Sequence, residues 1–195
     1  GLFNLVMALF IVFSQFSTFG VHYSVIKYTA ENHDNEEKQK GILTAGILLS
    51  LLTSLSIATI SALLLPFIGD MFSFHYLSEA WLFTIPGIIF FSLNKNFLAF
   101  INGQKRMLTF ASLTSLRYIS LLIFLVIIIY MNFPAYALGS IITLSEIVVS
   151  AACLWVIWDK IKWTFKLSEW YRHHFIFGAK SCLAGASIEL NSRVA

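Results

Sequence analysis

The fold class is decided by one stretch of sequence, Leu121-Leu122-Ile123-Phe124-Leu125-Val126-Ile127-Ile128-Ile129-Tyr130. Its apolar side chains follow one another without the polar alternation that the strands of a membrane β-barrel show. A helix needs about 20 mostly apolar residues to cross the hydrocarbon core of a bilayer. The surrounding run, 109–131, is long enough. A transmembrane helix is therefore predicted here, because a helix satisfies its own backbone hydrogen bonds in lipid.

Similar runs fill most of the chain. Hydrophobic residues make up 58% of the 195 residues and charged residues 12%, whereas soluble domains average roughly 45–50% and about 25%. A water-soluble globular enzyme is nearly excluded, because a domain of this size could not bury so much apolar surface. The 19 Phe residues exclude a disordered chain. The sequence predicts an all-α, polytopic transmembrane helix bundle.

Five complete spans and one incomplete span are predicted. They cover 2–22, 42–66, 80–102, 109–131, 136–158 and 174–195. No linker rich in Pro or Gly divides the chain, so we expect one bundle over 1–195. The chain begins inside an apolar run without Met and stops inside another. We therefore expect a fragment that is incomplete at both ends.

Charge is distributed unevenly among the connections between these spans. Every Lys and Arg between spans lies in one of three connections: 22–42, 103–108 and 159–173. The other two connections, 67–79 and 132–135, hold Asp70 and Glu79 instead. By the positive-inside rule the basic connections face the cytoplasm. The first span then runs from outside to inside, and one missing span upstream is the simplest expectation.

Six charged residues fall inside the predicted spans, where a central charge costs about 2.5–3.5 kcal/mol on insertion scales. They are Lys95, Arg117, Glu146, Lys180, Glu189 and Arg193. Four cations and two carboxylates predict a polar cavity with excess positive charge, suited to an anion such as a phosphate or pyrophosphate. Other interpretations stay open for single residues. Lys95, Arg117 and Lys180 can snorkel to headgroups. Glu146 can form a structural bridge with Arg117 or Lys95, and Glu189 and Arg193 can neutralise each other.

Pro86-Gly87 lies inside the third predicted span. Proline lacks a backbone N–H, so it removes one hydrogen bond from a helix and can bend it. A static kink is the simpler interpretation of this pair, and a hinge is the functional one.

The sequence contains no motif for catalysis, metals or cofactors. Gly-x-Ser-x-Gly, HExxH, Walker and Gly-rich nucleotide-binding loops are all missing from it. Cys153 and Cys182 lie in apolar runs without CxxC spacing. The adjacent His173 and His174 would point apart on a helix. We expect no catalytic residue, no metal, no cofactor and no nucleic-acid partner.

Three stretches together resemble a known family. They are Phe19-Gly20 followed by Ser24-Val25-Ile26-Lys27-Tyr28; Asn96-Phe97-Leu98-Ala99-Phe100-Ile101-Asn102-Gly103-Gln104-Lys105-Arg106-Met107 leading into Leu116-Arg117-Tyr118; and Phe177-Gly178-Ala179-Lys180-Ser181 closing with Leu190-Asn191-Ser192-Arg193. Their order and spacing resemble the polysaccharide-transporter branch of the multidrug/oligosaccharidyl-lipid/polysaccharide exporter superfamily. This branch includes the bacterial O-antigen flippases, or Wzx-like proteins. The resemblance extends over essentially the whole chain.

The resemblance implies about one six-helix lobe of a two-lobe transporter, in the inner membrane of a bacterium. The implied activity is a flippase that moves an undecaprenyl-diphosphate-linked oligosaccharide, an O-antigen or another surface polysaccharide unit, between leaflets by alternating access. Implied partners are membrane lipids, the second lobe of the same protein, a polysaccharide polymerase and a chain-length regulator. Lys95, Arg117, Lys180 and Arg193 match positions of cationic cavity residues, and Glu146 joins them as a substrate-binding candidate.

Two other functions remain as alternatives. A cation-coupled multidrug exporter of the same superfamily would need an acidic site, whereas the predicted intramembrane cations outnumber the carboxylates. A membrane-embedded polysaccharide polymerase would carry its catalytic residues in a large periplasmic loop, and the outer connections predicted here are short. A transporter without enzymatic activity is the expectation.

Single cysteines introduced at Ser73 and Asn35, in a variant that lacks Cys153 and Cys182, test the orientation. We expect an impermeant thiol reagent added to whole cells to label the cysteine at 73 and not the one at 35. Labelling after lysis is the control for reactivity. The reverse pattern in whole cells would show that the orientation is inverted.

Overall fold

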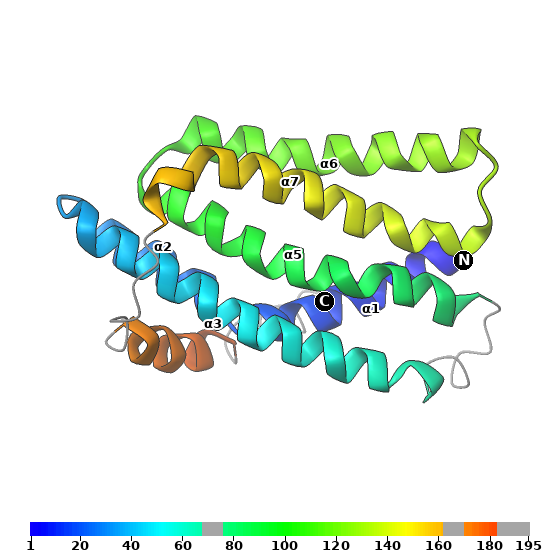
Figure 1. Ribbon diagram of the computed structural model, residues 1–195, viewed down its shortest axis with the longest axis horizontal. Helices are drawn as coiled ribbons and strands as arrows, with labels where there is room; N and C mark the ends of the chain where they lie inside the picture. The colour runs from blue at the N-terminus through cyan, green and yellow to red at the C-terminus, as the bar shows by residue number, and fades with distance from the viewer. Residues whose placement is uncertain (68–75, 162–169, 183–195) are drawn as a thin grey trace, which may run out of the picture.

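The computed structural model describes residues 1–67, 76–161 and 170–182, and regular structure in this part of the chain is helical throughout. In chain order the elements are α1 (Leu2–Thr18), α2 (Val21–Glu31), α3 (Glu36–Leu63), α5 (Leu77–Gly103), α6 (Met107–Tyr130), the 3-10 helix η1 (Ala135–Gly139), α7 (Ser140–Ile157) and the 3-10 helix η2 (Trp158–Lys160). A last helical segment covers 170–182. The long helices lie side by side along one axis (Figure 1). The predicted all-α bundle is confirmed.

Four of these helical stretches are long and apolar enough to cross a membrane. They are Glu36–Leu63, Leu77–Gly103, Met107–Tyr130 and Ala135–Lys160. The α1–α2 pair, bent by 49°, forms a fifth span if it is counted as one. The chain is therefore a multi-pass membrane protein. Of the predicted span 174–195, only 174–182 falls within the described residues.

Helix α5 is the centre of the bundle, because it packs against α1, α2, α3, α6 and α7. Two apolar clusters surround it at different heights. One includes Val25, Leu43, Phe100, Val149 and Cys153, and the other includes Val6, Phe10, Trp81, Ile88 and Ile142. Polar side chains occupy the level between the two clusters. This polar belt comprises Ser17, Ser50, Thr53, Ser92, Asn94, Asn96, Arg117, Glu146 and Ser150.

The first span differs from the predicted 2–22, because its helix breaks at Phe19 and Gly20 and resumes as α2. Both residues have positive φ, 44° and 66°. A Cβ atom on Gly20 would lie 2.6 Å from the carbonyl oxygen of Gly178, so only glycine fits there. The break frees carbonyls of α1, and the one of Ser17 accepts hydrogen bonds from the hydroxyls of Thr53 (2.8 Å) and Ser92 (3.1 Å). Neighbouring helices thus satisfy the backbone that this break exposes.

A second irregularity lies at Pro86, which α5 accommodates without ending. Gly87 donates its backbone N–H to the hydroxyl oxygen of Thr143 at 3.0 Å. The same hydroxyl donates to the carbonyl of Phe83 at 2.6 Å. Thr143, on α7, therefore bridges the donor and the acceptor that an undisturbed helix would join directly. Close packing accompanies this bridge, since a Cβ atom on Gly87 would lie 3.0 Å from Thr143 Oγ1.

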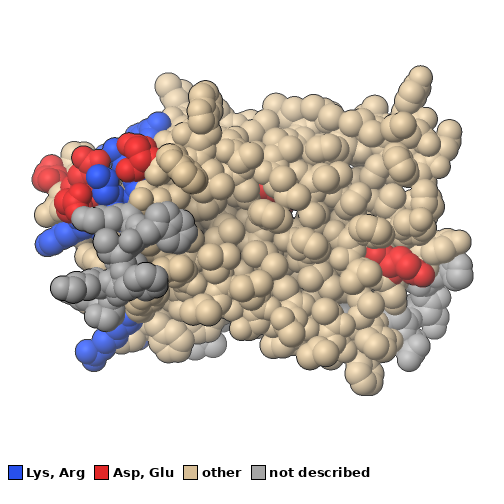
Figure 2. Space-filling view, viewed as in Figure 1, with Lys and Arg blue, Asp and Glu red and all other residues tan. Residues whose placement is uncertain are grey.

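Charged side chains gather at one end of the bundle (Figure 2). This basic end carries the α2–α3 connection, the α5–α6 connection and η2. Glu36 at the start of α3 lies 2.9 Å from Lys160 of η2 and 3.4 Å from Lys40. Asn35 caps α3 by accepting the N–H of Lys38 at 3.0 Å. The positive-inside rule predicts that this end faces the cytoplasm.

The Thr143 bridge predicts a specific loss of stability. Thr143→Val removes the hydroxyl and leaves Gly87 N–H and the Phe83 carbonyl without this partner, so the free energy of unfolding should fall by about 1–2 kcal/mol. Thr143→Ser keeps the hydroxyl and is the matched control. Pro86→Ala allows the direct α5 hydrogen bond to close, so it should reduce the effect of Thr143→Val. Unfolding in detergent, followed by circular dichroism, compares the wild type, the three single variants and the Pro86→Ala/Thr143→Val double variant. Equal stability of the Val and Ser variants would contradict the bridge.

Candidate functional site

The candidate site overlaps the polar belt, where α5, α6 and α7 meet. We call it the central cluster, and it comprises Phe91, Asn94, Lys95, Arg117, Glu146 and Ser150. On α5, Asn94 and Lys95 lie three and four positions after Phe91, so both are neighbours of Phe91 on the surface of that helix. The two α7 residues are four apart and also share a face. Arg117 reaches the cluster from α6. Three helices thus converge on one carboxylate.

Glu146 is the residue on which the contacts of the cluster converge. Arg117 Nη2 donates a hydrogen bond to Glu146 Oε2 at 3.1 Å. Arg117 Nε lies 2.7 Å from Oε1, close but poorly aligned for a hydrogen bond. Asn94 Nδ2 donates both to Oε2, at 2.8 Å, and to the Glu146 backbone carbonyl, at 2.9 Å. Ser150 completes the chain by donating to Asn94 Oδ1 at 2.8 Å. The carboxylate is therefore held from α5 and α6 at once.

The ion pair is shielded from its surroundings. The side chain of Glu146 is 4% exposed and that of Arg117 is 13% exposed. A charge at this depth has no water to solvate it, so each partner requires the other. Removing one member of a buried pair typically costs about 3–5 kcal/mol, because the remaining charge is uncompensated. The pair thus determines how α6 and α7 meet.

Two cations, Arg117 and Lys95, face the aromatic ring of Phe91. Arg117 Cζ lies 5.2 Å and Lys95 Nζ 5.4 Å from the centroid of its ring. A cation within about 6 Å of a ring centroid is attracted by the ring quadrupole. Phe10 from α1 meets the same ring edge-on, with the centroids 5.3 Å apart. The aromatic ring is therefore fixed from a third side while it supports both cations.

The central cluster holds one carboxylate and two cations. Glu146 is the only buried carboxylate within 1–67, 76–161 and 170–182. It pairs with Arg117, and Lys95 faces the same Phe91 ring as Arg117, so the six residues of the cluster carry a formal charge of +1. A positive site inside a membrane protein suits an anionic ligand, because it supplies the charge that lipid cannot.

The structure brings together three of the five predicted site residues. Lys95, Arg117 and Glu146 meet in the central cluster, and the Arg117–Glu146 pair is one of the arrangements that the sequence left open. Lys180 lies elsewhere, exposed on the 170–182 helix at the rim of a separate pocket. Arg193, like Glu189, falls outside the described residues.

The position of Lys180 follows from the way in which its helix packs. His174 is fully buried, donates from Nε2 to the Ile42 carbonyl at 3.0 Å and accepts at Nδ1 from the Ser24 hydroxyl at 2.7 Å. A neutral imidazole supplies one donor and one acceptor, which matches these two partners. The helix is thereby held on α2 and α3, and Lys180 lies at the pocket between this helix and α2.

Sequence reasoning missed Phe91, Asn94 and Ser150 as members of the site. A weak signal was present, since Asn94 precedes Lys95 and Ser150 lies four residues after Glu146. Asn and Ser are common within membrane helices as packing residues, so type and spacing alone do not mark them. Their role depends on which helix faces which.

A double-mutant cycle on the ion pair gives a testable prediction. Arg117→Leu or Glu146→Leu alone should lower the free energy of unfolding by about 3–5 kcal/mol, because each leaves a buried charge unpaired. The double variant should lose less than the sum of the two. Thermal unfolding of the purified protein measures the effect, with the exposed Glu79→Leu as a control that removes a carboxylate without a buried partner. Additive losses would show that the two side chains do not interact.

Comparison with known proteins gives one match. The family model described as "Polysaccharide biosynthesis protein" matches residues 1–194. No curated protein and no solved structure matches the chain. The matched range includes α5 and the five helices that pack against it. The chain therefore belongs to the polysaccharide biosynthesis protein family.

Proposed function

We propose that this protein is a flippase for an undecaprenyl-diphosphate-linked oligosaccharide, such as an O-antigen unit, in the inner membrane of a bacterium. Its family supports a role in polysaccharide biosynthesis. Its multi-pass architecture supports transport across a membrane. The observation that carries the proposal is the central cluster, in which the cations of Lys95 and Arg117 face one aromatic ring at mid-bundle.

A diphosphate is the chemical group that such a cluster recognises best. Guanidinium and ammonium groups make short, charge-assisted hydrogen bonds to phosphate oxygens. Arg117 is oriented by Glu146, so its direction is fixed before a ligand arrives. Lys95 is half-buried and rests against Phe91. We assign the first contact with the diphosphate to Lys95, and the role of a fixed positive neighbour to Arg117.

The same geometry disfavours the two alternatives. A multidrug exporter for cationic substrates requires an available carboxylate, whereas Glu146 already accepts hydrogen bonds from Arg117 and Asn94. A polymerase requires a nucleophile or an acid–base pair. In the central cluster the one carboxylate already accepts hydrogen bonds from Arg117 and Asn94. Transport without covalent chemistry is the function we propose.

Lys95 provides the cleanest test, because Arg117 also supports the fold. In the full-length protein, Lys95→Met removes the charge and keeps an unbranched apolar side chain, whereas Lys95→Arg keeps the charge. We expect surface polysaccharide in a flippase-deficient strain to fall at least about tenfold with Met and to be largely retained with Arg, since a charge-assisted contact is lost only in the first. Immunoblots of membranes verify equal abundance. Normal export by the Met variant would overturn the assigned role.

A further inference from the structure

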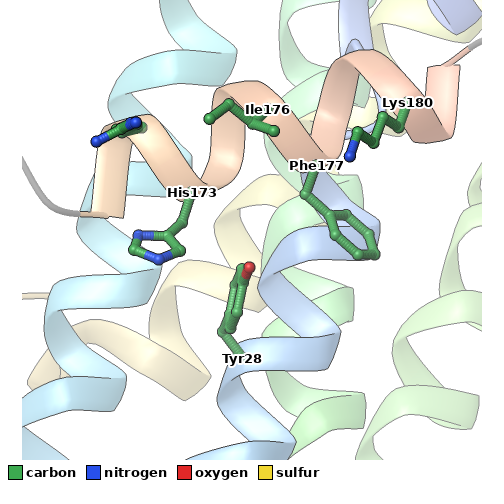
Figure 3. A pocket seen from close by; sticks show the side chains of 6 residues that line it. Tyr28, His173, Ile176, Phe177 and Lys180 are labelled. Atoms are coloured by element: carbon green, nitrogen blue, oxygen red, sulfur yellow. The ribbon is translucent and has the colours of Figure 1, made fainter.

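A second basic site lies at the basic end, apart from the central cluster. It is a pocket of about 360 Å³ lined by Tyr28, Arg172, His173, Ile176, Phe177 and Lys180. Tyr28 comes from α2, and the other lining residues come from the 170–182 helix. Figure 3 shows Tyr28 rising toward that helix between His173 and Phe177, with Lys180 beyond Phe177. The pocket is thus the space between two helices, with aromatic side chains standing in it.

Tight packing holds the two walls in place. Gly20 and Gly178 allow a close approach, since a Cβ atom on Gly178 would lie 2.6 Å from the Phe19 carbonyl oxygen. His174 ties the helix to Ser24 of α2 and Ile42 of α3 on its buried face. Residues 173, 176, 177 and 180 follow one another at helical spacing and form the opposite wall. Residues other than the cations Arg172 and Lys180 therefore make the contacts that set the shape of the pocket.

Among the described residues that line it, the pocket carries cations and no carboxylate. Arg172 and Lys180 are exposed, and neither has a hydrogen bond or ion pair to another described residue. Lys27 adds a third cation, with its Nζ 5.0 Å from the ring centroid of Phe177 and 5.1 Å from that of Tyr28. Its nearest acidic neighbour is Glu31, on the same helix, at 3.8 Å. The local excess of positive charge selects for an anion.

The surroundings place this anion at the level of lipid headgroups. Trp155 and Trp158 are 88% and 70% exposed at the same end of the bundle. Trp170 packs beside the pocket, its ring 5.5 Å from that of Tyr28. Exposed tryptophan side chains prefer the membrane–water interface. Apolar lining by Ile176 and Phe177 next to the cations matches a ligand with a charged head and an acyl tail.

We propose that this pocket binds the phosphate of an anionic membrane phospholipid, such as phosphatidylglycerol. Arg172 and Lys180 supply charge-assisted hydrogen bonds to the phosphate oxygens, and the Tyr28 hydroxyl supplies a further donor. The acyl chains leave the pocket past Ile176 and Phe177. Basic pockets between transmembrane helices are known to bind anionic headgroups in this way. The site is independent of the transported substrate, which the proposed function places at Lys95.

Titration of the purified full-length protein with fluorescent phosphatidylglycerol tests the site. Arg172→Gln/Lys180→Gln should raise the dissociation constant about tenfold or more, because each basic residue near an anionic lipid contributes to affinity. Lys38→Gln/Arg106→Gln removes the same charge from exposed positions at the same end and should change it less than about twofold. Phosphatidylcholine, which has no net charge, should bind both pairs of variants alike. Elution from size exclusion and the melting temperature verify that every variant is folded.

Three results would overturn the proposal. Equal loss in the pocket and control variants would indicate general surface charge instead of a site. Unchanged affinity in the pocket variant would exclude these cations as headgroup ligands.

In a second titration, undecaprenyl diphosphate displaces the phospholipid only if the pocket serves the substrate. Displacement at equimolar lipid would assign the pocket to transport, whereas its absence supports a phospholipid site. Loss of transport by Lys95→Met with intact phospholipid binding would separate the two sites.

Discussion

The structure depends on one constraint, which is that a polar group inside the hydrocarbon layer must find its partner within the protein. Three features create such groups: the helix break at Gly20, the proline of α5 and the buried ion pair. Side chains from neighbouring helices satisfy each of them, Thr53 and Ser92 at the first, Thr143 at the second and Asn94 at the third. The polar belt is the result. It lies between two apolar clusters because its members serve one another and leave the lipid-facing surface apolar.

These contacts link helices that hydrophobic packing alone would leave free to slide. On α5, Ser92 bonds to α1, Asn94 to α7 and Asn96 to Ser50 of α3. A shift of α5 along its axis would break all three hydrogen bonds within the same low-dielectric layer, where no water replaces them. Sliding of single helices is therefore costly, and motion of the bundle as one body costs less. Rigid-body rocking of lobes is the way in which many transporters built from repeats alternate access.

The sequence predicts the features that depend on neighbouring residues in the chain. It does not predict those that depend on residues far apart in the chain. Apolar runs alone predict helices and their approximate extents, because the requirement for internal hydrogen bonding acts on each run separately. The break at Phe19 and Gly20 inside the first predicted span was not predicted, because Gly178 and Ser92, which contact it, are distant in the sequence. Pairing of Arg117 with Glu146 could be stated as one of several arrangements. Choosing among them requires knowing that α6 faces α7, which no residue pattern in either helix encodes.

The depth of a cation in the bundle determines whether it needs a partner within the protein. In the polar belt Arg117 requires Glu146, so the presence of the cation there already implies a partner and a fixed position. At the headgroup level water and lipid phosphates solvate a cation, so Arg172 and Lys180 stay exposed at little cost. Lys180 therefore has a charge in an apolar run without being part of a mid-membrane cavity. Lys95 differs from both kinds, because it lies at the depth of the ion pair while the one buried carboxylate there is already bound by Arg117 and Asn94. Its ammonium faces the Phe91 ring together with Arg117, and in the function proposed above it makes the first contact with the diphosphate.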